Sequence, residues 1–93
     1  MKKELLEEFQ HLMKDLDEAA FETIDMRIKK NPESISYFKN CFLEEDNLDR
    51  KEIFAHIIIS HEPYEDAIIF LMEDRGWEEE DFEGFDGYSK WKN

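Results

Sequence analysis

The chain of 93 residues is 41% hydrophobic, 40% charged and 14% aromatic, and its formal net charge is −13. The apolar content is too high for a disordered acidic chain, and the length matches a single domain. The net charge opposes binding to nucleic-acid phosphates and to anionic membranes, and it favours a basic protein as partner. Solubility alone is the competing explanation of this charge.

Residues 2–30 carry apolar side chains at intervals of three and four, the period of an amphipathic helix. One apolar stripe ends at Leu16, and a second runs from Ala20 to Ile28. Asp17 lies between them and has a side chain that can cap the N-terminus of a new helix. Because no Gly or Pro lies in this region, the pattern permits either one long helix or two helices that meet near residues 16–17.

The sequence Asn31-Pro32-Glu33 interrupts this pattern, and Pro32 suits the first position of a helix. The helical spacing then continues to about Glu45 and ends in a polar turn over residues 44–47. The apolar stripe of this third helical region consists of Ile35, Phe38, Cys41 and Phe42.

Residues 48–60 fit two interpretations. The run from Ile53 to Ile59 is rich in β-branched residues, as in a buried strand. Polar residues nevertheless recur at steps of three and four, which places them on one narrow line along a helix. We favour a nearly enclosed helix, and the polar line consists of Asp49, Glu52, His56 and Ser60.

The next helix is expected from about Tyr64 to Asp74. Pro63 suits its first turn, and Gly76 is a typical stop after its C-terminus. The run Ile68–Met72 is apolar on all sides, which indicates a central helix. The helices near 49–60 and 63–75 should therefore form the centre of the domain.

The last third of the chain holds most of the negative charge. From His61 to Asn93 there are eleven acidic and three basic residues. Aromatic residues are interleaved with the acids, and four of them are spaced by three: Phe82, Phe85, Tyr88 and Trp91. Residues Glu78–Phe82 are compatible with a helical turn, whereas Gly84 and Gly87 argue against a long regular helix.

These elements predict an all-α fold, a compact bundle of four to five helices with an aromatic-acidic C-terminal segment. We expect a single helical domain over residues 1–93. Its core should span about 2–75, and residues 76–93 should form a C-terminal cap or tail.

Cys41 is the single cysteine, so an intrachain disulfide is excluded, which fits a reducing compartment. Its place beside the apolar stripe favours a small core residue over a reactive thiol. The N-terminal sequence lacks the apolar segment of a signal peptide, and the run Ile68–Met72 is too short to span a membrane. We therefore expect a soluble cytoplasmic protein.

No catalytic or metal-binding motif is present. His56, His61, Glu62 and Glu65 are the one set with metal-ligand chemistry, but two His residues five apart do not share a helix face. An EF-hand loop that starts at Asp81 fails, because Phe85 and Lys92 occupy positions that need oxygen ligands. We expect a protein that is not an enzyme and that uses no cofactor or metal.

The C-terminal segment is the candidate binding surface. Its rings either pack on the core or lie outside beside the carboxylates, as anchors among steering charges. Packing and binding are compatible if Trp77 and Phe82 pack on the core while Phe85, Tyr88 and Trp91 lie outside. The residues expected to bind the partner are Glu78, Glu79, Glu80, Asp81, Glu83, Phe85, Asp86, Tyr88 and Trp91.

The sequence thus favours a small acidic inhibitor or neutraliser, of the immunity-protein, antitoxin or nucleic-acid-mimic type. It would block a basic partner protein, such as a nuclease or a nucleic-acid-binding protein, and would bind neither nucleic acid nor membrane directly. The alternative is a non-catalytic regulatory or adaptor module. That module would bind a partner, or itself as a homodimer, through a helix face with Met26, Tyr37 and Ile69 as anchors.

Overall fold

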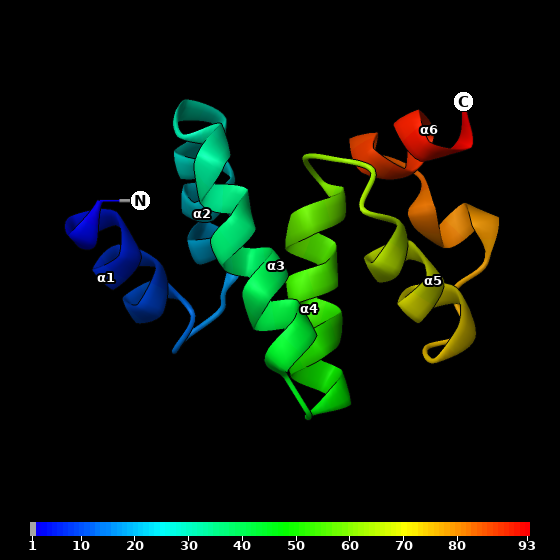
Figure 1. Cartoon of the computed structure of the whole chain (residues 1–93), viewed down its shortest axis with the longest axis horizontal. Coiled ribbons are helices and arrows are strands. Elements are labelled where there is room, and N and C mark those ends of the chain that lie inside the picture. Colours follow the sequence, from blue (N-terminus) through cyan, green and yellow to red (C-terminus); the bar gives the residue numbers. More distant parts are fainter. Residues whose placement is uncertain (1) are drawn as a thin grey trace. The chain divides into compact units, whose positions relative to one another are not determined.

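A computed structural model describes residues 2–93. Over these residues the chain forms six α-helices and two 3₁₀ helices and no strand, and 74% of it is helical. The all-α prediction is confirmed, and the expected four to five helices are one or two too few. Figure 1 traces the elements, which are α1 (Lys3–Leu12), α2 (Glu18–Lys30), η1 (Pro32–Ser34), α3 (Ile35–Glu44), α4 (Leu48–Ile59), α5 (Glu65–Glu73), η2 (Glu79–Phe82) and α6 (Asp86–Lys92).

Contacts divide the chain into two compact units, one up to Ile35 and one from Ser36 to Asn93. The first unit contains α1, α2 and η1 and ends at the first residue of α3, and the second contains the rest of α3 and the elements up to α6. That residues 1–93 form a single domain stays a prediction.

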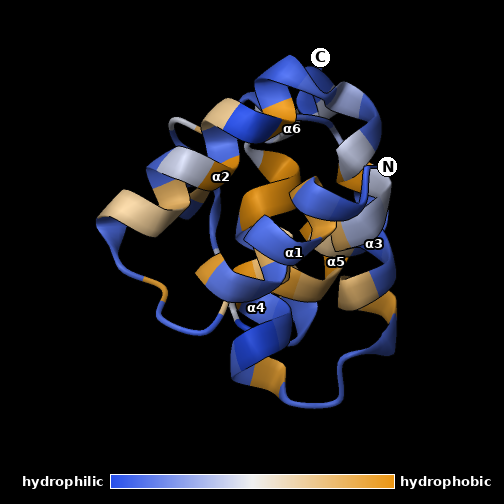
Figure 2. Cartoon of the chain, turned by 90° about the vertical axis from the view of Figure 1, so that its left-hand side faces the viewer, coloured by the Kyte–Doolittle hydropathy of each residue, from blue (hydrophilic) through white to orange (hydrophobic). Residues whose placement is uncertain are grey.

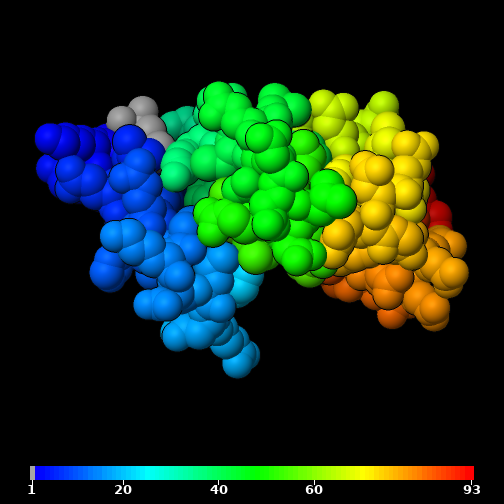
Figure 3. All heavy atoms as spheres, turned by 90° about the horizontal axis from the view of Figure 1, so that it is seen from below, coloured from blue at the N-terminus to red at the C-terminus, as the bar shows by residue number. Residues whose placement is uncertain are grey.

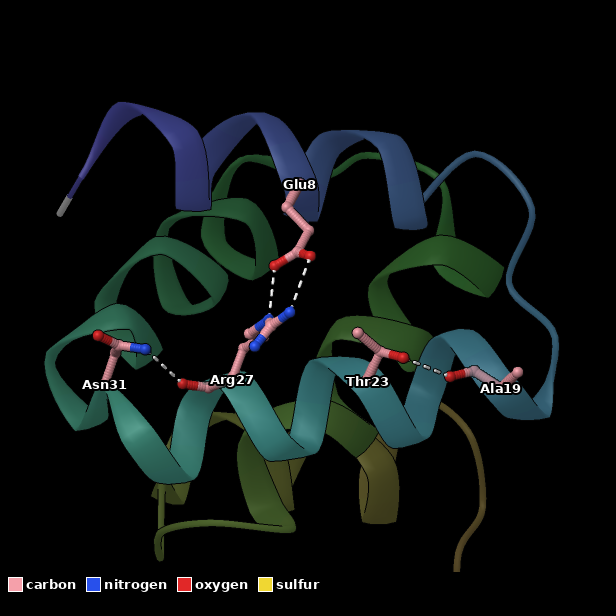
Figure 4. Close-up of polar contacts among 5 residues, drawn as sticks. All are labelled: Glu8, Ala19, Thr23, Arg27 and Asn31. Carbon is pink, nitrogen blue, oxygen red and sulfur yellow. Dashed lines mark hydrogen bonds and ion pairs between the residues drawn. The ribbon is translucent and has the colours of Figure 1, made fainter.

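In the first unit, residues 2–30 form two helices, because the Asp17 side chain accepts a hydrogen bond from the Ala20 N–H at 2.8 Å and so caps α2. Across α1 and α2, Arg27 Nε donates to Glu8 Oε1 at 2.7 Å and Arg27 Nη2 donates to Glu8 Oε2 at 3.3 Å (Figure 4). This paired geometry fixes the register of the two helices. The buried side chains of the unit include Phe9, Met13, Ala20, Ile24 and Ile28.

The end of α2 is closed by side chains. Asn31 Nδ2 donates to the Arg27 carbonyl at 3.0 Å (Figure 4), and Ser34 Oγ donates to the Asn31 carbonyl at 2.7 Å. Pro32 opens η1, as its fixed φ favours. The predicted break at residues 31–33 is therefore confirmed.

In the second unit, the polar line correctly predicted a helix: α4 covers residues 48–59, and Ser60 is its C-cap. The Asn47 side chain caps α4 by accepting from the Arg50 N–H at 3.0 Å. Five residues of α4 are buried: Phe54, Ala55, Ile57, Ile58 and Ile59. Figure 2 shows hydrophobic stretches on α4 and α5. The β-branched residues are accommodated because their burial outweighs a helix propensity that differs by only tenths of a kcal/mol.

Helix α5 packs against α4 with Ala67, Ile68 and Leu71 fully buried. Pro63 was expected in the first turn of this helix, but α5 begins at Glu65 and Pro63 precedes it. Gly76 adopts a φ of +71°, which confirms its predicted role after the C-terminus of the helix. Arg75, which follows α5, contacts the polar line of α4. Its Nε donates to Glu52 Oε1 at 2.6 Å, and its Nη2 donates to Asp49 Oδ1 at 2.8 Å.

Candidate partner-binding surface

The C-terminal segment, residues 77–92, contains Trp77, η2, the turn over residues 83–85 and α6. Figure 3 shows it, in orange to red, at the surface of the second unit beside α5. Its helix α6 contacts α4. Residues 77–92 form two short helices and no long regular one, as Gly84 and Gly87 predicted: Gly84, with a φ of +89°, lies between η2 and α6, although Gly87 itself lies inside α6.

Gly87 is buried because α6 approaches backbone of the α4–α5 region. A Cβ atom added at Gly87 would collide with the carbonyl oxygens of Ile59 and Glu62, and it would lie 2.7 Å from the carbonyl carbon of Glu62. Only glycine permits this approach. Helix α6 therefore packs, at Gly87, directly against the backbone of the last turn of α4 and of the residues that follow it.

The aromatic rings of the segment form a continuous cluster. Phe82 is fully buried and stacks on Tyr88, with ring centroids 4.3 Å apart and an interplanar angle of 11°. Trp77 packs on Phe82 at 5.0 Å and on Phe85 at 5.8 Å. These ring contacts hold the parts of the segment to one another, and such aromatic pairs add to the hydrophobic gain of burial.

His56 is the residue of α4 that enters this cluster. Its ring lies 4.7 Å from Trp77 and 5.4 Å from Phe85, and both contacts are edge-to-face. Burial lowers the pKa of His56, and the charge of Glu52 opposes this shift in part. Glu52 itself binds Arg75, so the neutral imidazole is the form that this site favours.

The six acidic residues predicted to bind a partner all lie exposed at the surface; we call them the acidic face, and they are Glu78, Glu79, Glu80, Asp81, Glu83 and Asp86. Two of them also hold η2: the Glu78 N–H donates to Asp81 Oδ2 at 2.8 Å, and the Glu78 carboxylate accepts from the Asp81 N–H. Lys92 pairs with Glu79. Four of the six, Glu78 to Asp81, thus belong to the short element η2 and its N-cap; Glu83 follows it directly, and Asp86 begins α6.

The three aromatic residues predicted at the surface do not behave alike. Tyr88 is only 8% exposed, and its expected outward position is wrong, because stacking on Phe82 turns the ring into the core. Phe85 is half-buried against Trp77 and His56. Trp91 is 38% exposed, as predicted.

Two residues near the surface were not among those predicted to bind. Glu65, at the start of α5, accepts a hydrogen bond from Trp91 Nε1 at 3.4 Å. His56 lies beneath Trp77 and Phe85. Its place on the polar line of α4 was visible in the sequence, whereas its ring partners depend on how the C-terminal segment folds back.

Among residues 2–93, no group of three or more His, Cys, Asp and Glu side chains is arranged to hold a metal ion. No helix in this described part of the chain has the length and apolar character that crossing a membrane requires. Cys41 is half-buried, and burial raises the pKa of its thiol.

Lowering the pH from 7.5 to 5.5 is expected to destabilise the C-terminal segment. The folded-state pKa of His56 lies below its unfolded value of about 6.5, so stability is full above that pH and is lost as the pH falls below it. Thermal melts followed by tryptophan fluorescence should show this loss. His56→Phe should remove it, and His11→Gln, at an exposed site in the other unit, should not. Equal pH dependence in His56→Phe would contradict the assignment.

No protein-family model matches the chain, and comparisons with curated proteins and with solved structures also find no match.

Proposed function

We propose that the protein is a non-catalytic inhibitor or neutraliser that binds a basic partner protein through the acidic face. The observation that carries this proposal is the exposure of all six carboxylates on a segment in which the rings of Phe82 and Tyr88 are buried. A segment that served packing alone would not need so many acids, and one that served solubility alone would not need the rings.

The distribution of charge supports the proposal. The second unit contains sixteen acidic and six basic residues, so it carries −10 of the net charge of −13. A field concentrated in this way raises the association rate with a basic protein and turns the acidic side toward it. Such steering weakens as ionic strength rises, because the Debye length falls to about 8 Å at physiological salt.

The packing of the segment supports it as well. Because Phe82 and Tyr88 are buried and η2 is capped, the carboxylates are ordered before a partner arrives. A binding surface that is already ordered loses less conformational entropy on association. A basic cleft that normally holds nucleic-acid phosphates is the kind of partner that such a surface fits.

Reversing Glu79, Glu80 and Glu83 to Lys is expected to abolish partner binding while the melting temperature changes little. These three side chains are exposed, and exposed charges contribute little to stability. The triple variant leaves the Glu78–Asp81 cap intact. Binding is measured by pull-down from lysate of the source cell, with washes at low and then high salt and identification of bound proteins by mass spectrometry.

The matched control is the triple variant Glu7→Lys, Glu22→Lys and Glu44→Lys. It changes the net charge by the same amount, and its three positions are also exposed but lie outside the C-terminal segment. A basic protein that is released by salt, lost with the first triple variant and retained by the control supports the proposal. Binding that survives the first triple variant contradicts it.

A second candidate function is a regulatory or adaptor module that binds through apolar residues. Large hydrophobic side chains lie at the surface, with Met26 54%, Leu43 57% and Leu48 50% exposed. Of the anchors expected from the sequence, Met26 and Ile69 are exposed and Tyr37 is half-buried. A partner that resists the high-salt wash, or capture of the protein by itself as a homodimer, would favour this function.

A further inference from the structure

Trp91 differs from the other rings of the C-terminal segment. It is 38% exposed, whereas Phe82 and Tyr88 are buried and Trp77 and Phe85 are half-buried. Exposure of a tryptophan leaves a large apolar area in water, and tryptophan is among the residues enriched where binding energy is concentrated. The neighbours of Trp91 therefore indicate what it can bind.

One neighbour is a carboxylate. Trp91 Nε1 donates to Glu65 Oε2, and at 3.4 Å this hydrogen bond is long. Glu65 is exposed in the first turn of α5. A carboxylate has about four acceptor positions. One long bond from the indole therefore leaves Glu65 able to accept further donors.

The other neighbour is the buried ring column. Tyr88 lies 5.9 Å from Trp91 with an interplanar angle of 35°, and Tyr88 stacks in turn on Phe82. The ring of Trp91 is therefore supported from below by Tyr88 and held at its N–H edge by Glu65. Its remaining surface faces solvent in a defined orientation.

A supported indole beside a carboxylate that can accept further donors is suited to a guanidinium group. The planar cation stacks on the ring, and its N–H donors can pair with both carboxylate oxygens. A lysine ammonium is a more strongly hydrated point charge that offers no such planar stack. Building on the function proposed above, we infer that Trp91 and Glu65 bind an arginine side chain of the basic partner protein.

The test uses two capped tetrapeptides of equal charge, tetra-arginine and tetra-lysine, titrated into the full chain at one fixed ionic strength. Binding is followed by NMR through the indole N–H signals, and the Trp91 signal is assigned with Trp91→Phe. We expect tetra-arginine to bind about 2- to 5-fold more tightly than tetra-lysine, the factor that an exposed cation–π contact provides. The Trp91 indole signal should shift with tetra-arginine more than the Trp77 signal.

Two variants make the inference falsifiable. Trp91→Leu should reduce the ratio of the two affinities to about one, as the loss of the ring predicts. Glu65→Gln, at an exposed position, should weaken tetra-arginine binding more than tetra-lysine binding. The Glu65 variant keeps the test valid if Trp91→Leu detaches α6. Equal affinities in the unchanged protein, or an unchanged ratio in both variants, would overturn the inference.

The same titration separates this inference from the proposed function. The triple variant at Glu79, Glu80 and Glu83 should weaken both peptides and leave their affinity ratio unchanged. If the triple variant binds both peptides as tightly as the unchanged protein, the proposal that the acidic face binds the partner is contradicted. The inference about Trp91 and Glu65 is still judged by the ratio of the tetra-arginine and tetra-lysine affinities. If neither peptide binds at low salt, both proposals fail.

Discussion

Leu71→Ala is expected to lower the free energy of unfolding by about 2–5 kcal/mol, because it opens a cavity where α5 packs on α4. Leu71 is fully buried, and Ile57 on the facing helix is 2% exposed, so Ile57→Ala should cost a similar amount. Urea unfolding followed by circular dichroism measures both effects.

Ile69→Ala is the matched control for these core variants. It makes the same chemical change as Ile57→Ala and lies on the same helix as Leu71, but its side chain is 37% exposed. Its cost should be well below that of the core variants, since less apolar surface is returned to water. If Leu71→Ala or Ile57→Ala leaves stability unchanged, the central pairing of α4 and α5 is wrong.

Gly87→Ala is expected to destabilise the protein by about 1–3 kcal/mol or more, with detachment of α6. The new methyl group would collide with the carbonyl oxygens of Ile59 and Glu62. These are backbone atoms, so they cannot turn away as a side chain can. The sign of the effect is informative, because Gly→Ala inside a helix otherwise stabilises by about 0.5–1 kcal/mol.

Detachment of α6 should be visible in two signals. The fluorescence of Trp77 and Trp91 should shift to longer wavelength as the ring cluster opens, and the melting temperature should fall. Ser89→Ala is the control, since Ser89 is exposed on the same helix and the substitution also introduces alanine there. A Gly87→Ala variant as stable as the unchanged protein would show that α6 does not rest on these carbonyl groups.

The helix over residues 48–59 could be predicted because its signal is local. Polar residues at Asp49, Glu52 and His56 share one side of a helix, and no strand would place them together. The structure confirms the helix although the run Ile57–Ile59 favours a strand by propensity. Periodicity over a whole element outweighed the propensity of a few residues.

For residues 2–30, helical periodicity does not decide between one helix and two. The apolar stripes of one long helix and of two shorter ones are the same, so the choice depends on Asp17. Its side chain bonds the Ala20 N–H and starts α2 there. Asp17 was recognised as a possible cap, but only its geometry decides between the two cases.

The positions of the rings in the C-terminal segment depended on more than spacing. Phe82, Phe85, Tyr88 and Trp91 are spaced by three, yet Phe82 ends η2 and Tyr88 lies in α6. Because the turn over residues 83–85 changes the direction of the chain, equal spacing does not give equal burial. Tyr88 and Trp91 both follow this turn in α6 and still differ, because Tyr88 stacks on Phe82 and is buried, whereas Trp91, one residue before the end of the helix, is 38% exposed.

The all-α class, the buried helices α4 and α5 and the surface position of the acids could be predicted from the sequence, because they follow from periodicity and from the cost of burying charge. The role of Gly87, the burial of Tyr88 and the pairing of Trp91 with Glu65 emerge only from the folded chain. Each of these depends on atoms distant in the chain: the Ile59 carbonyl lies 28 residues before Gly87, and Glu65 lies 26 residues before Trp91. No local pattern encodes such approaches, which arise only when the helices pack.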